Sequence, residues 1–278
     1  MKTLRISKSL LLAYDAVMMG EACGVQFKSM YLDKTHRLDP TPAMMKGNRF
    51  EFLALGIKNR DGSEPEPIKT SSGNVSKAEE EKVKAQAERC KQALEKHGFE
   101  IMGTDQKKVN DFDGFQIVSV LDAEGTKDGE PVIIDTKYSG LLYNKWEVMG
   151  WHPEKIANNI FHQKQALMYM FHMAHRTGKL YDFYYLVHSA TNDVESEIFK
   201  MQFSDDPDMH QKMAKEQFQI FERSLHSIAK TIRLQYDMDG FKAVPTVKGC
   251  MECPLMADGS CKHAISVPEI TKVNMVIL

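Results

Sequence analysis

The sequence predicts an α/β fold built around one substantial hydrophobic core. Two strand-like runs joined by a turn-rich segment lie near the middle of the chain, and segments with helical spacing occur on both sides. The 278 residues are 42% hydrophobic and 27% charged, which is sufficient for one core and leaves room for a subdomain. We expect a single domain over residues 1–278, with a helical N-terminal segment (1–60) and a cysteine-bearing C-terminal segment (240–278).

The first half of the chain is expected to contain a loop followed by a helix. Residues 61–76 are rich in residue types that favour loops, including Gly62, Pro65, Pro67 and Gly73. After this loop, apolar residues recur at helical spacing, at Val83, Ala87, Cys90 and Leu94. Gly98 is placed as a C-terminal stop for the helix. Because Cys90 lies on the apolar face, we interpret it as a core residue.

The second half is expected to begin with a hairpin and to continue with alternating elements. Residues 115–121 and 131–137 have the pattern of strands, and the turn-rich segment 124–129 joins them. Helical patterns follow over 156–177 and 207–236, and strand patterns over 182–189 and 194–203.

The overall charge argues against a protein that coats nucleic acid by bulk attraction. The net charge is −2 and the sequence pI is about 6.6. Any contact with DNA must therefore be local, in a confined positive groove beside an acidic pocket. The sequence also lacks a glycine-rich phosphate loop with its Lys-Ser/Thr, so that we expect no NTPase motor.

Several features indicate a cytoplasmic protein. The basic N-terminus is followed by an apolar run, but that run is interrupted at Asp15 and lacks a cleavage pattern, so we expect no export signal. No stretch approaches the roughly 18 uninterrupted apolar residues of a membrane helix. The chain has five cysteines, an odd number that argues against a secreted disulfide framework and allows a metal site.

The most informative residues are Asp135-Thr136-Lys137, at the end of an apolar strand and thirteen positions after Asp122. Alternate strand residues leave a sheet on the same face, so Asp135 and Lys137 can meet one metal ion and one scissile bond. Asp122, Asp135 and the carbonyl oxygen of Thr136 are hard oxygen ligands that suit Mg or Mn. Such a cation would offset charge in phosphodiester hydrolysis and acidify the attacking water. Lys137 could orient that water or stabilise the developing negative charge.

Further polar residues with suitable spacing lie on either side of this motif. Upstream, Glu51 lies within the amphipathic run 47–56, where it could equally be a solvated helical carboxylate. Downstream, Gln165 and Tyr169 are four positions apart in a predicted helix and share one face, although packing is the default explanation for both.

The order of these motifs resembles that of the RecB-type exonucleases within the PD-(D/E)XK nuclease superfamily. Gly47-x-x-Phe50-Glu51 resembles the first motif. Many members have a histidine in this motif, whereas here Phe50 occupies the neighbouring position and Glu51 would be the ligand. This form resembles the variant of phage-associated members. Asp122 resembles the second motif, Asp135-x-Lys137 the third, and Gln165-x-x-x-Tyr169 the helical motif that follows. One departure is Leu121, which stands where the superfamily has its eponymous proline.

The resemblance spans residues 5–261 and implies a restriction-endonuclease-like core, a central mixed sheet flanked by helices. It further implies that Glu51, Asp122 and Asp135 bind Mg or Mn and that Lys137 assists catalysis. Gln165 and Tyr169 would position the DNA backbone or the lysine.

The cysteines of the C-terminal segment have metal-site spacing. Cys250 and Cys253 are separated by two residues, and Cys261 follows after seven more. Some RecB-type nucleases resemble this arrangement, with one N-terminal and three C-terminal cysteines around a 4Fe-4S cluster, which implies Cys23 as the fourth ligand. Gly24 departs from the proline that usually follows the first cysteine. Zinc, with His263 in place of Cys23, and reduced thiols without a metal remain as alternatives.

We therefore expect a Mg- or Mn-dependent DNA exonuclease, phage-encoded or from another mobile element, that acts on DNA ends or single strands in recombination, repair or replication. Partner proteins of recombination or replication are expected with it. Two alternatives share the same fold: a non-cleaving module that binds DNA ends or a partner, and a structure-specific endonuclease.

Overall fold

The computed structural model describes residues 3–70, 72–139, 151, 160–190, 196–245 and 247–263. The chain forms two compact units. The larger unit comprises Arg5–Lys8 and Pro40–Ser227, and the smaller unit comprises Met1–Leu4, Ser9–Asp39 and Ile228–Leu278. Both terminal segments therefore contribute to the smaller unit.

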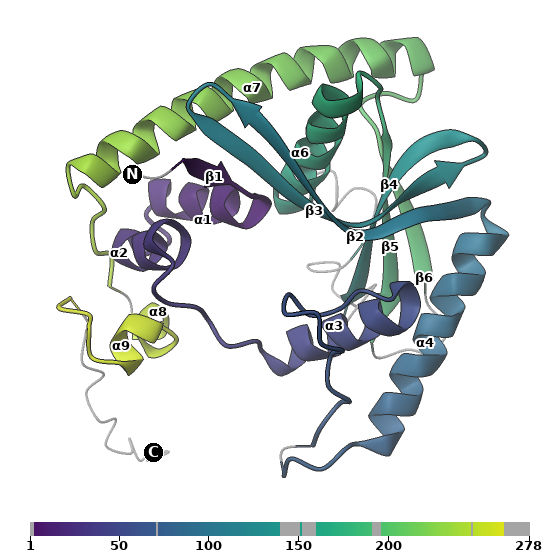
Figure 1. The fold of residues 1–278 in the computed structure, drawn as a ribbon, viewed down its shortest axis with the longest axis horizontal. Coiled ribbons are helices and arrows are strands. Elements are labelled where there is room, and N and C mark those ends of the chain that lie inside the picture. The colour runs from purple at the N-terminus through teal and green to yellow at the C-terminus, as the bar shows by residue number, and fades with distance from the viewer. Residues whose placement is uncertain are drawn as a thin grey trace, which may run out of the picture. The chain divides into compact units, whose positions relative to one another are not determined.

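A mixed β-sheet forms the centre of the larger unit (Figure 1). The strands found within the described residues are β1 (Leu4–Ile6), β2 (Phe99–Phe112), β3 (Phe115–Lys127), β4 (Glu130–Ser139), β5 (Asp182–Ser189) and β6 (Ser196–Met201). Their order is β1-β3-β4-β5-β6, and β2 also pairs with β3. β4 and β5 are parallel, whereas the pairs β2–β3, β3–β4 and β5–β6 are antiparallel.

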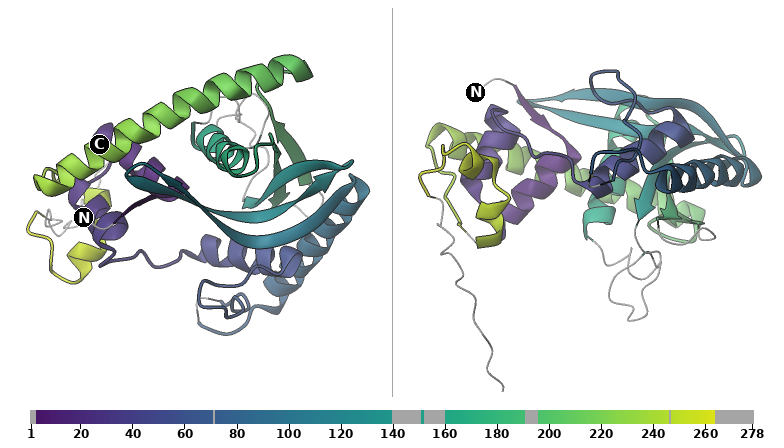
Figure 2. Two further views of the ribbon diagram at one scale, coloured as in Figure 1. Left: turned by 45° about the horizontal axis from the view of Figure 1, so that its top comes forward. Right: turned by 90° about the horizontal axis from the view of Figure 1, so that it is seen from below.

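Helices cover both faces of this sheet. α3 (Pro42–Leu55) and α4 (Lys77–Lys96) lie on one face, and α6 (Ile160–Thr177) lies on the other (Figures 1 and 2). This arrangement confirms the predicted α/β class with a mixed sheet flanked by helices. α7 (Pro207–Asp237) begins in the larger unit and ends in the smaller one.

Besides the end of α7, the smaller unit contains several short helices in its described part. They are α1 (Lys8–Met18, of which Lys8 belongs to the larger unit), α2 (Gly24–Phe27), the π-helical turn η1 (Lys28–Asp33), α8 (Val247–Met251) and α9 (Pro254–Ala257). Phe27 packs against Phe241, with ring centroids 5.5 Å apart. Among the described residues, no helix of either unit is both long and apolar enough to cross a membrane.

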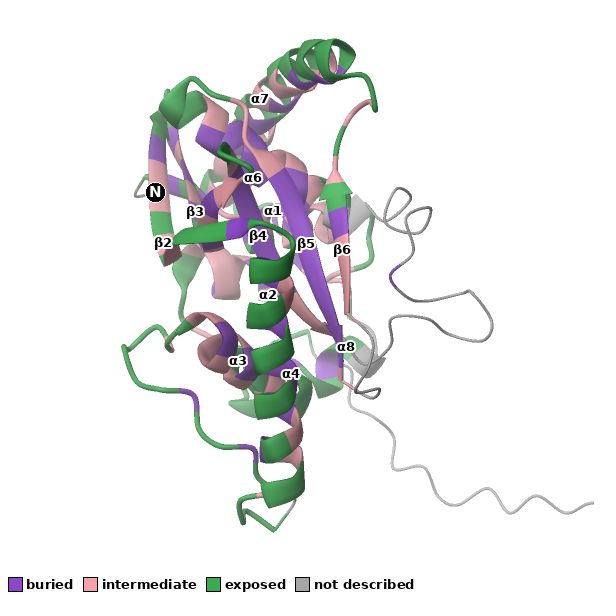
Figure 3. Cartoon of the chain, turned by 90° about the vertical axis from the view of Figure 1, so that its right-hand side faces the viewer, coloured by how far each residue is buried: buried purple, intermediate pink, exposed green. Residues whose placement is uncertain are grey.

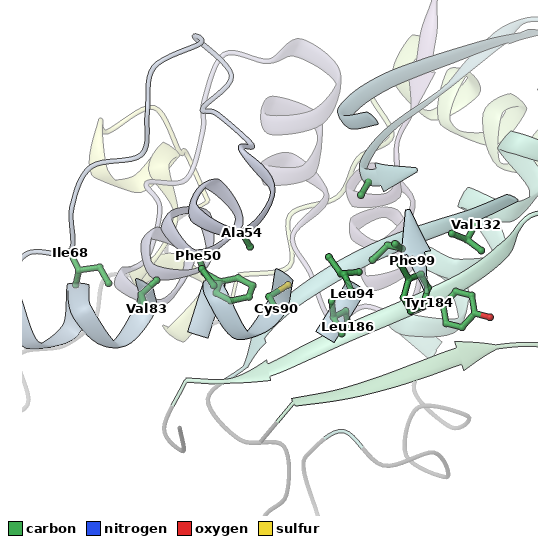
Figure 4. Packing of buried hydrophobic residues seen from close by; sticks show 13 residues of the cluster. Phe50, Ala54, Ile68, Val83, Cys90, Leu94, Phe99, Val132, Tyr184 and Leu186 are labelled. Atoms are coloured by element: carbon green, nitrogen blue, oxygen red, sulfur yellow. The ribbon is translucent and has the colours of Figure 1, made fainter. Parts of the chain in front are cut away.

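The predicted helix with Cys90 on its apolar face is confirmed by α4. Its apolar residues join side chains of α3 and the sheet in one buried cluster, shown in Figure 4, in which Cys90 and Phe50 are fully buried. Figure 3 shows the opposite face of α4 exposed to solvent. The helix ends at Lys96, and Gly98 adopts a φ of 73°, which is the left-handed conformation of a C-terminal stop.

The predicted hairpin is present, but its turn is much shorter than the segment 124–129. Residues 124–127 of β3 pair with residues 130–133 of β4, so that the turn consists of Asp128 and Gly129. Both adopt positive φ values, 54° and 86°, as a two-residue hairpin turn requires. Glu124 favours the strand because its carboxylate pairs with Lys108 of β2 at 2.8 Å.

The remaining predicted elements agree with the structure in place and type. β5 and α7 follow their patterns closely, whereas β6 ends at Met201 and so stops before residues 202 and 203. Predicted helix residues 156–159 and strand residues 194 and 195 lie outside the described residues. β2 was not predicted, because its central residues are largely polar and lack a clean alternation of apolar and polar side chains.

Candidate active site

The β3–β4 hairpin brings the two predicted aspartates to its open end. The last pair in register is Ala123 with Ile134, and Asp122 and Asp135 are the next residues of the two strands. Directly opposed residues of an antiparallel pair share one face of the sheet. Asp122 is held in place because its Oδ2 accepts hydrogen bonds from the amide of Thr136 at 3.0 Å and from its hydroxyl at 3.4 Å.

Asp135 and Lys137 form an ion pair on β4. Asp135 is only 2% exposed, and its Oδ2 contacts the Nζ of Lys137. The same Nζ lies 3.4 Å from the carbonyl oxygen of Thr136 and 5.8 Å from the ring centroid of Tyr185. Burial lowers the pKa of Lys137, but the negative charges of Asp135 and Asp122 raise it by more. The pKa of Lys137 therefore lies above its ordinary value. Lys137 therefore stays protonated at neutral pH.

Helix α3 supplies Glu51. The helix begins at the N-cap Thr41, whose hydroxyl accepts a hydrogen bond from the amide of Met44 at 3.2 Å, and it ends at Gly56, which adopts a φ of 74°. Phe50 is buried in the core and stacks on Tyr138 of β4 with centroids 4.9 Å apart. The packing of Phe50 fixes the position of Glu51 relative to the end of β4.

The carboxylates of this site repel one another in a partly buried environment, in which Asp135 is buried and Glu51 and Asp122 are half-buried. Burial and the charge of Asp122 raise the pKa of Glu51 to about 8. Burial and the charge of Asp135 raise the pKa of Asp122 to about 7. Lys137 acts in the opposite direction on both groups. Lys137 contacts Asp135, and Asp122 accepts a hydrogen bond from Thr136, which lies between those two residues. Glu51 is close enough for the charges of all three to act on its pKa, so the four side chains belong to one neighbourhood.

A divalent cation fits the chemistry of this neighbourhood. The donors are hard carboxylate oxygens, and a cation would relieve the repulsion that raises the pKa of Glu51 and Asp122. Over the ranges that the structure describes, however, no three His, Cys, Asp or Glu side chains are arranged as a metal-binding group. The assignment of Glu51, Asp122, Asp135 and the Thr136 carbonyl as ligands therefore stays a prediction.

Helix α6 contributes Gln165 and Tyr169 to the same face. Gln165 is buried, and its Nε2 donates a hydrogen bond to Oδ1 of Asp135. Tyr169 is also buried, with its ring centroid 6.1 Å from that of Phe183. Burial, followed by the charge of Asp135, raises the pKa of the Tyr169 phenol, so that it stays protonated. Gln165 thus contacts the acidic cluster directly, whereas Tyr169 packs beside it.

The structure adds Lys8 to the site, a residue that the sequence analysis missed. Lys8 belongs to the larger unit, and its Nζ donates a hydrogen bond to Oε1 of Gln165 at 3.1 Å. Burial lowers the pKa of Lys8, while Asp135 opposes this effect and Lys137 adds to it. No motif marks Lys8, because the position of its side chain depends on the pairing of β1 in the sheet.

The four predicted cluster cysteines all belong to the smaller unit. Cys250 and Cys253 are buried, Cys23 and Cys261 are half-buried, and the amide of Cys253 donates to the carbonyl oxygen of Cys250 at 3.1 Å. His263, the alternative ligand for zinc, is exposed. Within the described part of the chain, these side chains are not arranged as a metal-binding group.

The structure gives a physical reason for Gly24 after the first cysteine. The amide of Gly24 donates to the carbonyl oxygen of Lys242 at 2.9 Å, and a Cβ at this position would lie 2.7 Å from that oxygen. Proline has no amide hydrogen and therefore could not make this contact. The Cys23 segment is thus held against residues that precede Cys250 by only eight positions in the chain.

Comparison with protein families identifies the fold. The model of the PD-(D/E)XK nuclease superfamily matches residues 31–257, which is most of the chain. The protein belongs to the PD-(D/E)XK nuclease superfamily. The match confirms the predicted superfamily and the restriction-endonuclease-like fold, whereas the RecB-type branch and phage association stay predictions. Nucleases of this superfamily typically use divalent metals. Comparison with curated proteins gives no match.

Two solved structures that resemble this chain are named as exonucleases in their descriptions. A "putative exonuclease" from Eubacterium rectale is 14% identical, with a TM-score of 0.52, and the match covers 82% of each chain. LHK-Exo in complex with dAMP is 13% identical, with a TM-score of 0.41, over 84% of this chain and 93% of the other. At 14% identity the first likeness supports the fold alone, and the second carries no argument.

Proposed function

We propose that this protein is a Mg- or Mn-dependent DNA exonuclease. The observation that carries the proposal is the shared neighbourhood of the buried Asp135 and the half-buried Glu51 and Asp122, beside Lys137. Membership of the nuclease superfamily supports the same chemistry. A purely structural role does not account for this cluster, because burial and mutual repulsion of carboxylates are unfavourable for folding unless function requires them.

The proposed roles follow from the chemistry of the side chains. Glu51, Asp122 and Asp135, with the carbonyl oxygen of Thr136, would hold the cation. The cation, when bound, supplies Lewis acidity and lowers the pKa of water. Lys137 stays protonated and can stabilise negative charge that develops on the phosphate oxygens.

Helix α6 would position the other groups. Gln165 donates to Asp135 and therefore orients that carboxylate. Tyr169, buried on the same helix, would help to position the DNA backbone or Lys137. These roles support hydrolysis of a phosphodiester by a water molecule in line with the leaving oxygen.

A cleavage assay on two DNA forms tests the proposal. End-labelled linear DNA and a closed circle of the same sequence are incubated with Mg or Mn and with wild type, Asp135→Asn or Lys137→Met. We expect release of nucleotides from linear DNA by wild type only, with at least about a 10²-fold loss in each variant, as when a group that stabilises transition-state charge is removed. Lys91→Met on the exposed face of α4 is the matched control and should leave cleavage unchanged.

The outcomes separate the exonuclease from its alternatives. Digestion of the closed circle would instead indicate an endonuclease. DNA binding without cleavage in either metal would indicate a binding module. Undiminished Mn-dependent cleavage by both Asp135→Asn and Lys137→Met would contradict the residue assignments.

We also propose that Cys23, Cys250, Cys253 and Cys261 hold a 4Fe-4S cluster that joins both terminal segments of a single nuclease domain. Support comes from their membership of one unit and from the contact of Gly24 with Lys242. The cluster would have a structural role, since the acidic site uses other residues.

Anaerobic purification tests the cluster. We expect a brown protein containing about four iron atoms per chain, as a 4Fe-4S centre requires, with the colour lost in Cys253→Ser and retained in the core variant Cys90→Ser. Zinc without iron, or no metal, would contradict this proposal while leaving the nuclease assignment intact.

The Phe50-Glu51 form of the first motif supports a phage or mobile-element origin. The enzyme would then act in the cytoplasm of a bacterial host, on DNA ends or single strands that arise during recombination, repair or replication. Recombination or replication proteins would be its partners.

A further inference from the structure

Lys8 and Gln165 form a chain of contacts that ends on the central aspartate. Nζ of Lys8 lies 3.1 Å from Oε1 of Gln165, and Nε2 of Gln165 donates to Oδ1 of Asp135. Gln165 and Asp135 are both buried, with exposed fractions of 4% and 2%. The second oxygen of Asp135 faces Lys137. Asp135 is therefore held by a different side chain at each oxygen.

The amide oxygen of Gln165, rather than its nitrogen, faces the Nζ of Lys8. An ammonium group can only donate hydrogen bonds, so its partner must be the amide oxygen. The amide nitrogen is then directed to the opposite side, where it can donate to a carboxylate. With the amide reversed, its oxygen would face Asp135, and two acceptors would meet in a buried site, which is unfavourable.

The surroundings of Lys8 hold its backbone close to the acidic cluster. Lys8 is the first residue of α1 and is separated from β1 by one residue, and the Arg5 side chain of β1 donates to Gln116 of β3 at 3.0 Å. Its backbone is therefore tied to the sheet that carries the acidic cluster. Lys8 is half-buried, and partial loss of solvent disfavours its ammonium, whereas the surrounding carboxylates and the amide oxygen of Gln165 favour it.

We propose that Lys8 is a positioning residue of the nuclease site, which fixes the amide orientation of Gln165 and through it the carboxylate of Asp135. The role of Lys8 in metal binding rests on the proposed function, whereas its effect on Gln165 does not. Lys8 acts through Gln165 and is not assigned a contact with DNA.

The direct test observes the side-chain amide of Gln165 by ¹⁵N–¹H NMR, with Gln165→Ala used to assign the signal. In metal-free wild type, we expect one amide proton to be displaced downfield by its bond to Asp135. The displacement should be lost in Lys8→Met and retained in Lys8→Arg. An unchanged signal in Lys8→Met would overturn the proposal. Lys91→Met, which removes an exposed lysine, is the control and should leave the Gln165 signal unchanged.

A double-mutant cycle then measures the consequence for the metal. We expect the Mn dissociation constant, measured without DNA, to rise about tenfold in Lys8→Met and in Gln165→Ala, as is typical when an outer partner of a metal ligand is removed. The double variant should be no weaker than Gln165→Ala alone, and Lys8→Arg should restore most of the affinity. Effects that multiply in the double variant would mean that Lys8 acts independently of Gln165, and the positioning role would fail.

The two measurements keep the hypotheses separate. Wild type that binds no Mn and cleaves no DNA would refute the proposed function, and the Gln165 signal would still decide the role of Lys8. Conversely, if the enzyme is active and binds Mn but the Gln165 signal is the same in wild type and Lys8→Met, only the positioning role is refuted.

Discussion

Replacing Glu51 with glutamine should stabilise the metal-free protein in a pH-dependent way. The pKa of Glu51 rises from 4.5 to about 8, because burial and the charge of Asp122 disfavour the carboxylate. A raised carboxyl pKa favours folding at low pH, and this contribution is lost as the pH increases through the folded-state value. The folded protein should therefore lose stability between about pH 4.5 and pH 8, and glutamine should remove this loss.

The magnitude follows from the size of the pKa change. At about 1.36 kcal/mol for each pKa unit, the change from 4.5 to about 8 corresponds to at most about 5 kcal/mol. Part of this free energy is the mutual repulsion of Glu51 and Asp122, which disappears when either carboxylate is protonated. It therefore cannot be assigned to Glu51 alone. We therefore expect Glu51→Gln to gain about 1–3 kcal/mol at pH 8, and the melting temperature to rise by roughly 2–10 °C.

Thermal unfolding followed by circular dichroism at about pH 5 and pH 8, in EDTA, measures this effect. The advantage of Glu51→Gln should be small at pH 5 and large at pH 8. Glu88→Gln, on the exposed side of α4, is the matched control and should show little advantage at either pH. Added Mn should stabilise wild type more than Glu51→Gln. Equal destabilisation by Glu51→Gln at both pH values would refute the reasoning, because Glu51 would then be making a favourable contact.

Two further substitutions test the packing that supports the sites. Gly24→Ala should destabilise the smaller unit by about 1–3 kcal/mol in the same thermal assay, because the added Cβ would lie 2.7 Å from the carbonyl oxygen of Lys242. Gly47→Ala is the control and should be neutral or stabilising, because a Cβ at position 47 would meet no atom within 4 Å. Arg49→Met should cost about 3–5 kcal/mol in urea unfolding, because it leaves the buried Glu80 carboxylate without its 2.5 Å partner. Adding Glu80→Met should recover part of that loss, and a loss of less than about 1 kcal/mol would show that the pair behaves as a surface ion pair.

The sequence predicts best what is encoded over short distances. Cys90 follows from helical spacing alone, and the association of Asp122 with Asp135 follows from a hairpin, whose register is set by neighbouring residues. The turn at Asp128 and Gly129 was harder to locate, because Glu124 is a turn-favouring residue that a cross-strand lysine holds in β3.

The missed features depend on contacts between distant parts of the chain. β2 is largely polar and is stabilised by pairing along almost the whole of β3, so its own pattern is weak. Lys8 reaches Gln165 across 157 positions, and no local signal distinguishes it from the other basic residues near the N-terminus. Motif order identified Gln165, but the position of its amide between Lys8 and Asp135 is evident only in the folded structure.

Anomalous diffraction from crystals grown with Mn would test the shared cation most directly. We expect one strong Mn peak within coordination distance of carboxylate oxygens from residues 51, 122 and 135, and loss of that peak in Asp122→Asn. A Mn ion bound elsewhere, with these three side chains turned away from any common point, would contradict it.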